Sequence, residues 1–420
     1  MNRREFVSLS LESAFQISKP NFVVERARQA ALDVLKPSRS QLERGMALHA
    51  DAVVIDCYGF SPRAAIDPTE VAKAIDAGAS SSELDVLFEE MRVLRCITDP
   101  AEQAEYMDAW KAAGVTCIVE SAGEESQDPL RLIRRMARFT YLSDVMRDFV
   151  MKAARPDDIT AAKAQGHRCL YFAGNGIPLA QRWVSVEDEL SYIRTLFQLG
   201  MRMLHVTYNR RNLLGDGCAE QANAGLSDLG RAAIAEMNRV GLIVDVAHSG
   251  WRTSFEATRA SKRPAVASHS AVAALNQHIR AKPDEVIRAI ADSGGYVGIC
   301  CIPEFLGRSR DINALLDHVD YIVKRFGSSH VAIGTDIGHA SSYSEAANKE
   351  APRRPRARTR YEYFWPPGAL GGGGHPSLAW TNWPLFTVGM VMRGYSEDSI
   401  RQILGGNVLR VARAALEGVA

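Results

Sequence analysis

The sequence predicts a single (β/α)8 barrel, in which eight parallel strands alternate with helices around a closed core. Eight short apolar segments of strand length alternate with helix-length segments between residues 52 and 336. A chain of 420 residues is long enough to bury a core of this size. A doubly wound sheet is the alternative, but no GxGxxG follows the first strand segment, and the single GxG, at Gly174 and Gly176, follows the third. The alternation therefore favours the barrel.

The strand segments are short runs rich in valine, isoleucine, leucine and cysteine, as in strands that are buried on both faces. They are expected at residues 52–56, 115–119, 169–173, 203–207, 241–248, 264–269, 296–301 and 331–336. Apolar residues at helical spacing predict the intervening helices at 102–112, 130–152, 186–199, 226–240, 251–263, 283–293 and 312–326. Gly114 and Gly200 follow two of these segments and are typical helix ends.

Two further regions flank the strand segments. Residues 1–48 have a charged, helical pattern and are expected to form an N-terminal helical cover, and residues 49–420 form the barrel. The loop 338–376 after strand eight contains a basic run, an aromatic cluster and four consecutive glycines. A mobile lid and a solvated insertion are both consistent with this loop. A C-terminal helix is expected from about residue 396, broken by Gly405 and Gly406.

The composition excludes several classes of partner. Lys and Arg number 50 against 49 Asp and Glu, so no net charge favours nucleic acid or an anionic membrane. No apolar run approaches the roughly 20 residues of a transmembrane helix. Seven cysteines without a CxxC indicate a reducing, cytoplasmic location. Arg3 and Arg4 before Phe6 resemble a twin-arginine signal, but Glu12 interrupts the apolar region, so a periplasmic location is only the alternative.

Candidate reactive residues lie where the strands are expected to end, which is where barrels keep their chemistry. His248 and His269 follow strands five and six, which a strand–helix–strand unit places side by side. Neutral imidazoles in such a pair suit zinc. Asp336, after strand eight, is the expected general base or proton shuttle. Asp245, inside strand five, is expected in the core or as support for a ligand.

Further polar side chains follow other strands. Together with the two histidines and Asp336, they are the residue types that a metal-assisted hydrolase uses. They are Asp56, Cys57, Tyr58, Glu120 and Tyr208. His49 and Asp51 form an HxD, but they precede strand one and so belong to the opposite end of the barrel, where no ligand is expected.

The chain resembles the membrane dipeptidase (renal dipeptidase) family of zinc metallopeptidases. The resemblance is carried by GMRMLHVTYNRRN, LGRAAIAEMNRVGLIVDVAHSG, PAVASHSAVAALNQHIR, HVAIGTDIG and RGYSEDSIRQILGGNVLRV, in this order. It implies a (β/α)8 barrel that holds two zinc ions and cleaves dipeptides, often with a D-residue at the carboxyl side. By this resemblance His248 and His269 match zinc ligands, and Asp336 matches the catalytic aspartate. Arg280 matches the arginine that grips the substrate carboxylate, a role that suits a bidentate guanidinium.

The chain departs from the family pattern at the first metal site. The family's DGHND reads DCYGF here, so Tyr58 and Phe60 stand in place of a zinc-binding His and Asp. Ala173 stands where the family has a bridging Glu, and Tyr208 where it has a substrate-contacting His. One zinc ion is therefore expected rather than two. Since catalytic zinc normally has three protein ligands, a third is needed, and the candidates are Glu120, Asp336, His339 and His375.

The expected function is metal-dependent hydrolysis of a dipeptide or small amide. Asp336, Tyr58 and Tyr208 are the candidate catalytic residues, His248, His269 and Glu120 the candidate metal ligands, and Arg280 and Tyr208 the candidate substrate-binding residues. Two alternatives stay open: altered, non-peptidase chemistry that uses Tyr58 and Tyr208 as hydrogen-bond donors or acids, and a catalytically silent ligand-binding barrel. The family often dimerises, so a homodimer is one expected assembly.

Overall fold

The computed structural model describes residues 21–123, 129–177, 179, 181–352 and 373–419. The twin-arginine motif at Arg3 and Arg4 lies outside the described residues, as do residues 353–372 of the long loop, which include most of its basic run and its aromatic cluster.

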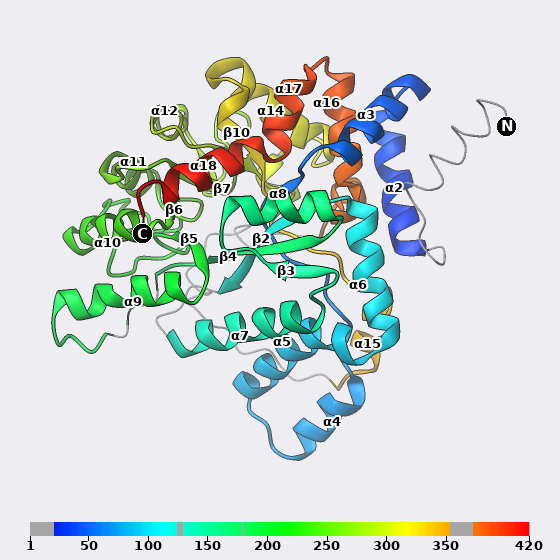
Figure 1. Ribbon diagram of the computed structural model, residues 1–420, viewed down its shortest axis with the longest axis horizontal. Helices are drawn as coiled ribbons and strands as arrows, with labels where there is room; N and C mark the ends of the chain where they lie inside the picture. The colour runs from blue at the N-terminus through cyan, green and yellow to red at the C-terminus, as the bar shows by residue number, and fades with distance from the viewer. Residues whose placement is uncertain (1–20, 124–128, 178, 180, 353–372, 420) are drawn as a thin grey trace.

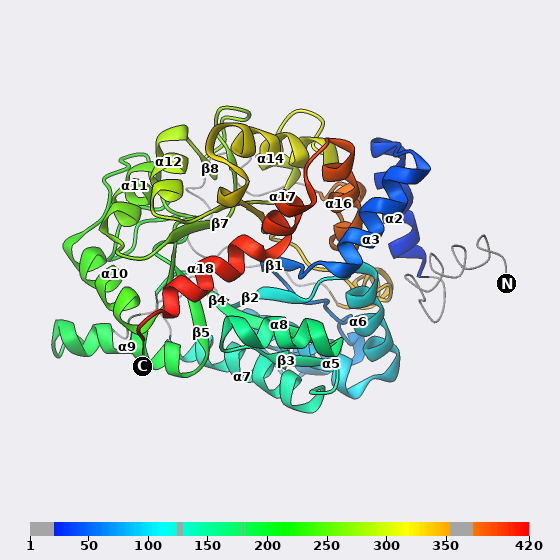
Figure 2. The ribbon, with the colours of Figure 1, turned by 45° about the horizontal axis from the view of Figure 1, so that its top comes forward.

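Eight parallel strands form the barrel, in the order β1-β2-β4-β5-β6-β7-β9-β10 (Figures 1 and 2). Their bounds are β1 (Ile55–Gly59), β2 (Cys117–Gly123), β4 (Arg168–Gly174), β5 (Met201–His205), β6 (Ile243–Asp245), β7 (Ala265–Val272), β9 (Val297–Ile299) and β10 (Val331–Ile333). Beyond the last strand, the amides of Asp336 and Phe60 donate to the carbonyls of Tyr58 (3.0 Å) and Ile337 (3.2 Å). These bonds draw the first and last strands together, and the predicted (β/α)8 fold is confirmed.

Two short strands lie outside this path. β3 (Val150–Lys152) pairs with β4, and β8 (Ala281–Lys282) pairs with β7. The predicted helix over 130–152 is therefore wrong in its last part: α7 (Pro129–Val145) ends earlier, and the chain turns to run beside the start of β4. β7 also extends past the predicted end of strand six, so His269 lies inside a strand rather than after it.

The helices pack outside the barrel, and side-chain caps fix where several begin. Ser80 and Glu83 form a capping box at the start of α5, and Asp99 and Asp311 cap α6 and α14. The helices are α2 (Phe22–Leu35), α3 (Arg39–Asp51), α4 (Pro68–Asp76), α5 (Ser81–Thr98), α6 (Pro100–Ala113), α7, α8 (Pro156–Gln165), α9 (Val186–Gln198), α10 (Asp228–Val240), α11 (Trp251–Ala260), α12 (Asp284–Asp292), α13 (Pro303–Leu306), α14 (Ile312–Phe326), α15 (Ser344–Glu350), α16 (Trp383–Met392), α17 (Glu397–Arg401) and α18 (Asn407–Leu416). Short 3-10 turns lie at η1 (Ser328–His330), η3 (Pro376–Leu378) and η4 (Trp380–Asn382).

Alternate residues of the strands fill the barrel. The apolar interior includes Ile55, Cys57, Cys117, Val119, Cys169, Tyr171, Met203, Ile243, Val266, Tyr296 and Ala332. Gly298 lies at a narrow point, where a Cβ would come within 1.8 Å of the Ser268 carbonyl oxygen. On β5 and β6 the next inward positions are His205 and Asp245, so the interior becomes polar toward the carboxyl ends of these strands.

The C-terminal segment closes the opposite end of the barrel (Figure 2). Val408, Val411 and Ala412 of α18 join the interior cluster, and Arg410 donates to the Ser329 carbonyl oxygen at 2.6 Å. The predicted break at Gly405 and Gly406 is a π-helical turn, η5 (Gln402–Gly406), that continues directly into α18.

The N-terminal helices α2 and α3 lie against α16, as both views show. Asn382 donates to the Ala27 carbonyl oxygen at 2.8 Å, and Gly45 lies so close to Val388 that a Cβ would come within 2.6 Å of it. Among the helices of the described residues, none is both long and apolar enough to cross a bilayer.

Candidate active site

His248, three residues after the end of β6, meets His269, which lies within β7. Their Nε2 atoms are 2.9 Å apart. His248 Nδ1 lies 2.7 Å from Asn209 Oδ1, which can only accept, so Nδ1 carries the proton and Nε2 presents its lone pair. Burial, with a further contribution from the Arg280 charge, holds the pKa of both histidines well below the ordinary value. Both rings are therefore neutral, the form that binds metals.

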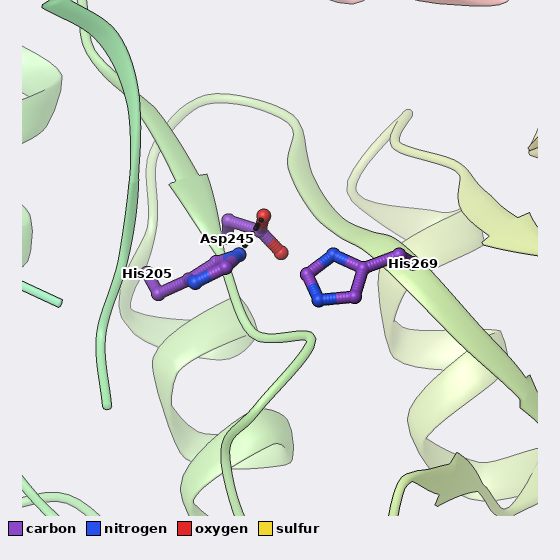
Figure 3. Close-up of side chains that lie close together, drawn as sticks. All are labelled: His205, Asp245 and His269. Atoms are coloured by element: carbon purple, nitrogen blue, oxygen red, sulfur yellow. Dashed lines mark ion pairs between the residues drawn. The ribbon is translucent and has the colours of Figure 1, made fainter. Parts of the chain in front are cut away.

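His205 and Asp245 lie beside this pair (Figure 3). They are register partners on β5 and β6, and His205 Nε2 is 2.7 Å from Asp245 Oδ2. Despite this distance the two atoms lack the direction of a hydrogen bond, and neither has another hydrogen-bond partner among the described residues. The ligand atoms of His205, Asp245 and His269 all lie within 4.8 Å of one another.

Asp245 is held as an anion. Burial alone would raise its pKa, but the neighbouring His205 and hydrogen bonds from Ser268 outweigh burial and keep the pKa below its ordinary value. Its Oδ1 accepts from the amides of Ala247 (2.9 Å) and Ser268 (3.0 Å), which leaves Oδ2 directed at His205.

His205 was not among the residues predicted from the sequence. It stands in the apolar run MLHV, where an isolated histidine reads as a core residue. The available signal was the alternation of the strand: His205 is two residues after the inward-facing Met203, and so faces the same interior.

Tyr58 and Tyr208 each stack on one histidine of the site. The Tyr58 ring lies on His269 with 3.9 Å between centroids, and the Tyr208 ring lies on His248 at 4.1 Å. Tyr58 lies within β1 and is buried, and its hydroxyl donates to Ser121 Oγ (2.8 Å) and contacts Asn175 Oδ1. Tyr58, which stands where the resemblance implied a ligand of the first metal site, is therefore packed against His269 instead.

Asp336 and Arg280 both lie close to His269. Asp336 Oδ1 is 4.0 Å from His269 Nε2, and 19% of the side chain is exposed, more than for any of the histidines. Burial raises the pKa of Asp336 to about 6. Arg280 is buried and donates from Nη2 to the His269 carbonyl oxygen at 3.1 Å, while its Nε has no hydrogen-bond partner within the described part of the chain.

The other predicted ligands lie elsewhere. Glu120 lies in the middle of β2, which runs on to Gly123, so the prediction that it follows the strand is wrong. Its Oε2 accepts from the Ser61 amide at 2.7 Å, and burial raises its pKa to about 7. It is not part of the group formed by His205, Asp245 and His269. Its role as a ligand stays a prediction.

The remaining histidines have partners of their own. His339 Nε2 is 3.3 Å from Glu105, and His375 Nδ1 is 2.8 Å from Ser377 Oγ. His49 contacts Thr387 Oγ1 at 2.8 Å and the Ala113 carbonyl oxygen at 2.9 Å, at the far end of the barrel.

The donor set fits the zinc ion implied by the resemblance. Neutral imidazoles and one ionised carboxylate are ordinary zinc ligands. The buried atoms His205 Nε2 and Asp245 Oδ2, which make no hydrogen bond within the described residues, are the kind of groups that a metal ion would satisfy.

Comparison with known proteins identifies relatives. The profile of Membrane dipeptidase (Peptidase family M19) matches residues 108–348, more than half of the chain. Dipeptidase tcpJ of Claviceps purpurea is 25% identical over 277 residues, 65% of this chain and 57% of the relative. The matched region spans about half the length of such curated relatives.

Two solved structures from Pseudomonas aeruginosa resemble this chain over most of its length. An amidohydrolase from Pseudomonas aeruginosa is 26% identical with a TM-score of 0.62, and the match covers 88% of this chain and 98% of that one. The probable dipeptidase PvdM from the same organism is 18% identical with a TM-score of 0.64, covers 90% and 99% of the two chains, and shows the same fold. The chain therefore belongs to the membrane dipeptidase family, peptidase family M19.

Proposed function

We propose that this protein is a single-metal hydrolase that cleaves a dipeptide or a similar small amide. The observation that carries the proposal is the pair of Nε2 atoms of His248 and His269, 2.9 Å apart, with Arg280 and Asp336 beside them. Zinc is the proposed ion because the ligands are imidazoles. One ion is proposed because Tyr58, Phe60 and Ala173 stand where further ligands of the family are expected.

The residues of the chain divide the work of hydrolysis. Bound here, zinc would supply Lewis-acid polarisation of a scissile carbonyl. Arg280 would hold the substrate carboxylate, since its Nε is without a hydrogen-bond partner among the described residues and its Nη2 is anchored on the His269 carbonyl. Asp336, with a pKa raised by burial to about 6, would accept a proton from the attacking water and deliver it to the leaving amine.

The two tyrosines support rather than replace this chemistry. The Tyr58 hydroxyl is already bonded to Ser121 and contacts Asn175, so we propose that Tyr58 fixes the His269 ring by stacking. Tyr208, stacked on His248, is proposed to border the substrate. Chemistry that uses these phenols without a metal is the alternative outcome of the test below.

The compartment and assembly are also proposals. All seven cysteines lie in the described residues as free thiols, and six of them are buried, which favours a reducing compartment such as the cytoplasm. A homodimer is proposed from the family alone.

Metal content and hydrolysis, measured together, test the function. The purified protein is expected to contain about one zinc ion per chain by elemental analysis and to cleave members of a panel of L,L- and L,D-dipeptides. The His248→Ala, His269→Ala double variant should lose both, while His375→Ala, a histidine bonded only within its own turn, should keep both. A wild-type protein with no metal above background would overturn the proposal and direct the search to the phenols.

A further inference from the structure

We infer that His205 and Asp245 complete the metal site, so that the ion is held by β5, β6 and β7 rather than beside β1. The inference rests on the proposed metal-dependent function and names two ligands that the family pattern does not supply. The expected occupant is a divalent ion that accepts nitrogen and oxygen ligands, such as zinc.

Strand register brings these two side chains to the histidine pair. His205 and Asp245 are direct partners across β5 and β6, and the residues two positions earlier, Met203 and Ile243, belong to the barrel interior. Both side chains therefore point inward toward His269, as Figure 3 shows. The imidazoles of His205, His248 and His269 have centroids 4.9–5.2 Å apart in every pairing.

The unsatisfied atoms require a partner. His205 and Asp245 are fully buried, and their closest atoms are 2.7 Å apart without the direction of a hydrogen bond. A buried polar atom left without a hydrogen bond destabilises the folded state, and a buried charged atom does so more strongly. A cation between the two groups would satisfy both.

The spacing suits one ion. Four ligand atoms about 2.1 Å from a tetrahedral metal lie roughly 3.4 Å from each other. The observed separations bracket this value: 2.7 Å for His205 and Asp245, and at most 4.8 Å within the group of His205, Asp245 and His269. His248 is not a member of that group and approaches it through His269, with 2.9 Å between their Nε2 atoms. His205, Asp245 and His269 would therefore hold the ion, with His248 as a fourth candidate ligand beside them.

The side toward β1 is closed to an ion. Tyr58 fills it, with its ring 3.9 Å from that of His269 and its hydroxyl bonded to neighbouring side chains. Ala173, on β4, offers no ligand atom. The ligands that replace the lost first-strand pair must therefore come from other strands, and β5 and β6 place His205 and Asp245 beside His269, with the Tyr58 ring 5.2 Å from that of His205.

Metal affinity of single variants tests the inference. We expect His205→Ala and Asp245→Asn to weaken zinc binding, measured by competition with a chromophoric chelator, by more than the roughly 10- to 100-fold that loss of a supporting residue costs. His375→Ala, the matched control, should bind like the wild type. Circular dichroism confirms that each variant is folded.

A measurement on the wild type covers the case in which a variant does not fold. X-ray absorption of the zinc-loaded protein should show three imidazole ligands; two imidazoles would overturn the inference. Unchanged affinity in His205→Ala and Asp245→Asn, with loss in the His248, His269 double variant, would also overturn it and leave the proposed function intact. Absence of metal from the wild type would overturn both.

Discussion

Lys282 offers a sharp test of the electrostatics beside the site. It lies on β8, fully buried, and donates from Nζ to the Ser249 carbonyl oxygen (2.7 Å) and to Ser254 Oγ (2.9 Å). No carboxylate of the described residues pairs with it by hydrogen bond. Burial lowers its pKa from 10.5 to about 7. The substitution to test is Lys282→Met, which keeps the length of the side chain and removes the charge.

The direction of the pH dependence of stability follows from how many protons the folded and unfolded chains bind. Between pH 7 and the ordinary lysine pKa the unfolded chain holds a proton that the folded chain has largely released, so the free energy of unfolding rises with pH. Stability from this group is thus complete above the unfolded pKa and is lost as the pH falls through about 7. At about 1.4 kcal/mol per pH unit, with half protonation at pH 7 taken into account, the wild type should gain about 2 kcal/mol relative to Lys282→Met between pH 7 and pH 9.

Urea denaturation of both proteins at several pH values, with metal content held constant, measures this difference. Other titrating groups are common to the two chains and cancel. The matched control is Lys262→Met, which alters an exposed lysine and should show no such trend. A constant difference between wild type and Lys282→Met from pH 7 to pH 9 would refute the reasoning, because it would mean that Lys282 stays charged when buried.

Further predictions concern packing, binding and metal. Gly298→Ala should lower the free energy of unfolding by about 3 kcal/mol or more, because the new Cβ meets the Ser268 carbonyl at 1.8 Å, while Gly374→Ala, with nothing within 4 Å, should be neutral in urea denaturation. Arg280→Lys should reduce kcat/KM for dipeptides with a free carboxylate by about 10- to 100-fold, and change dipeptide amides little. Tyr58→Phe should destabilise the fold by about 1–3 kcal/mol, since buried partners of its hydroxyl lose a bond; an unchanged denaturation midpoint would contradict this. Zinc at 100 times its Kd should stabilise the protein by about 2.7 kcal/mol, visible as a higher Tm that a chelator reverses.

The barrel was predictable because its strands are buried on both faces and therefore form continuous apolar runs. The pairing of His248 with His269 followed from the same logic, since consecutive parallel strands end at one edge. The distance of 2.9 Å between their Nε2 atoms agrees with that expectation.

Other features depended on information that a single segment does not contain. Alternation along β5 puts His205 on the same face as Met203, but only the register of β5 against β6 shows that its partner there is Asp245. The three residues of β3 are too few to show the alternation of buried and exposed side chains that marks a strand. The predicted helix before them therefore extended over these residues. Glu120 was expected to follow its strand but lies inside β2, and the bond from the Ser61 amide holds its carboxylate near the chain after β1, which sequence spacing does not reveal.

The packing of the first helices on the last ones has a consequence for how the chain folds on the ribosome. Most of the partners of α2 and α3 lie in η3, η4 and α16, more than 300 positions later, although His49 of α3 also contacts the Ala113 carbonyl oxygen at the end of α6. The end of the barrel opposite the site stays open until α18 is made. Closing such a long loop costs entropy that is repaid in full only when the late partners arrive. The packing of the N-terminal helices is therefore completed near the end of synthesis, and until then part of their apolar surface stays available to chaperones.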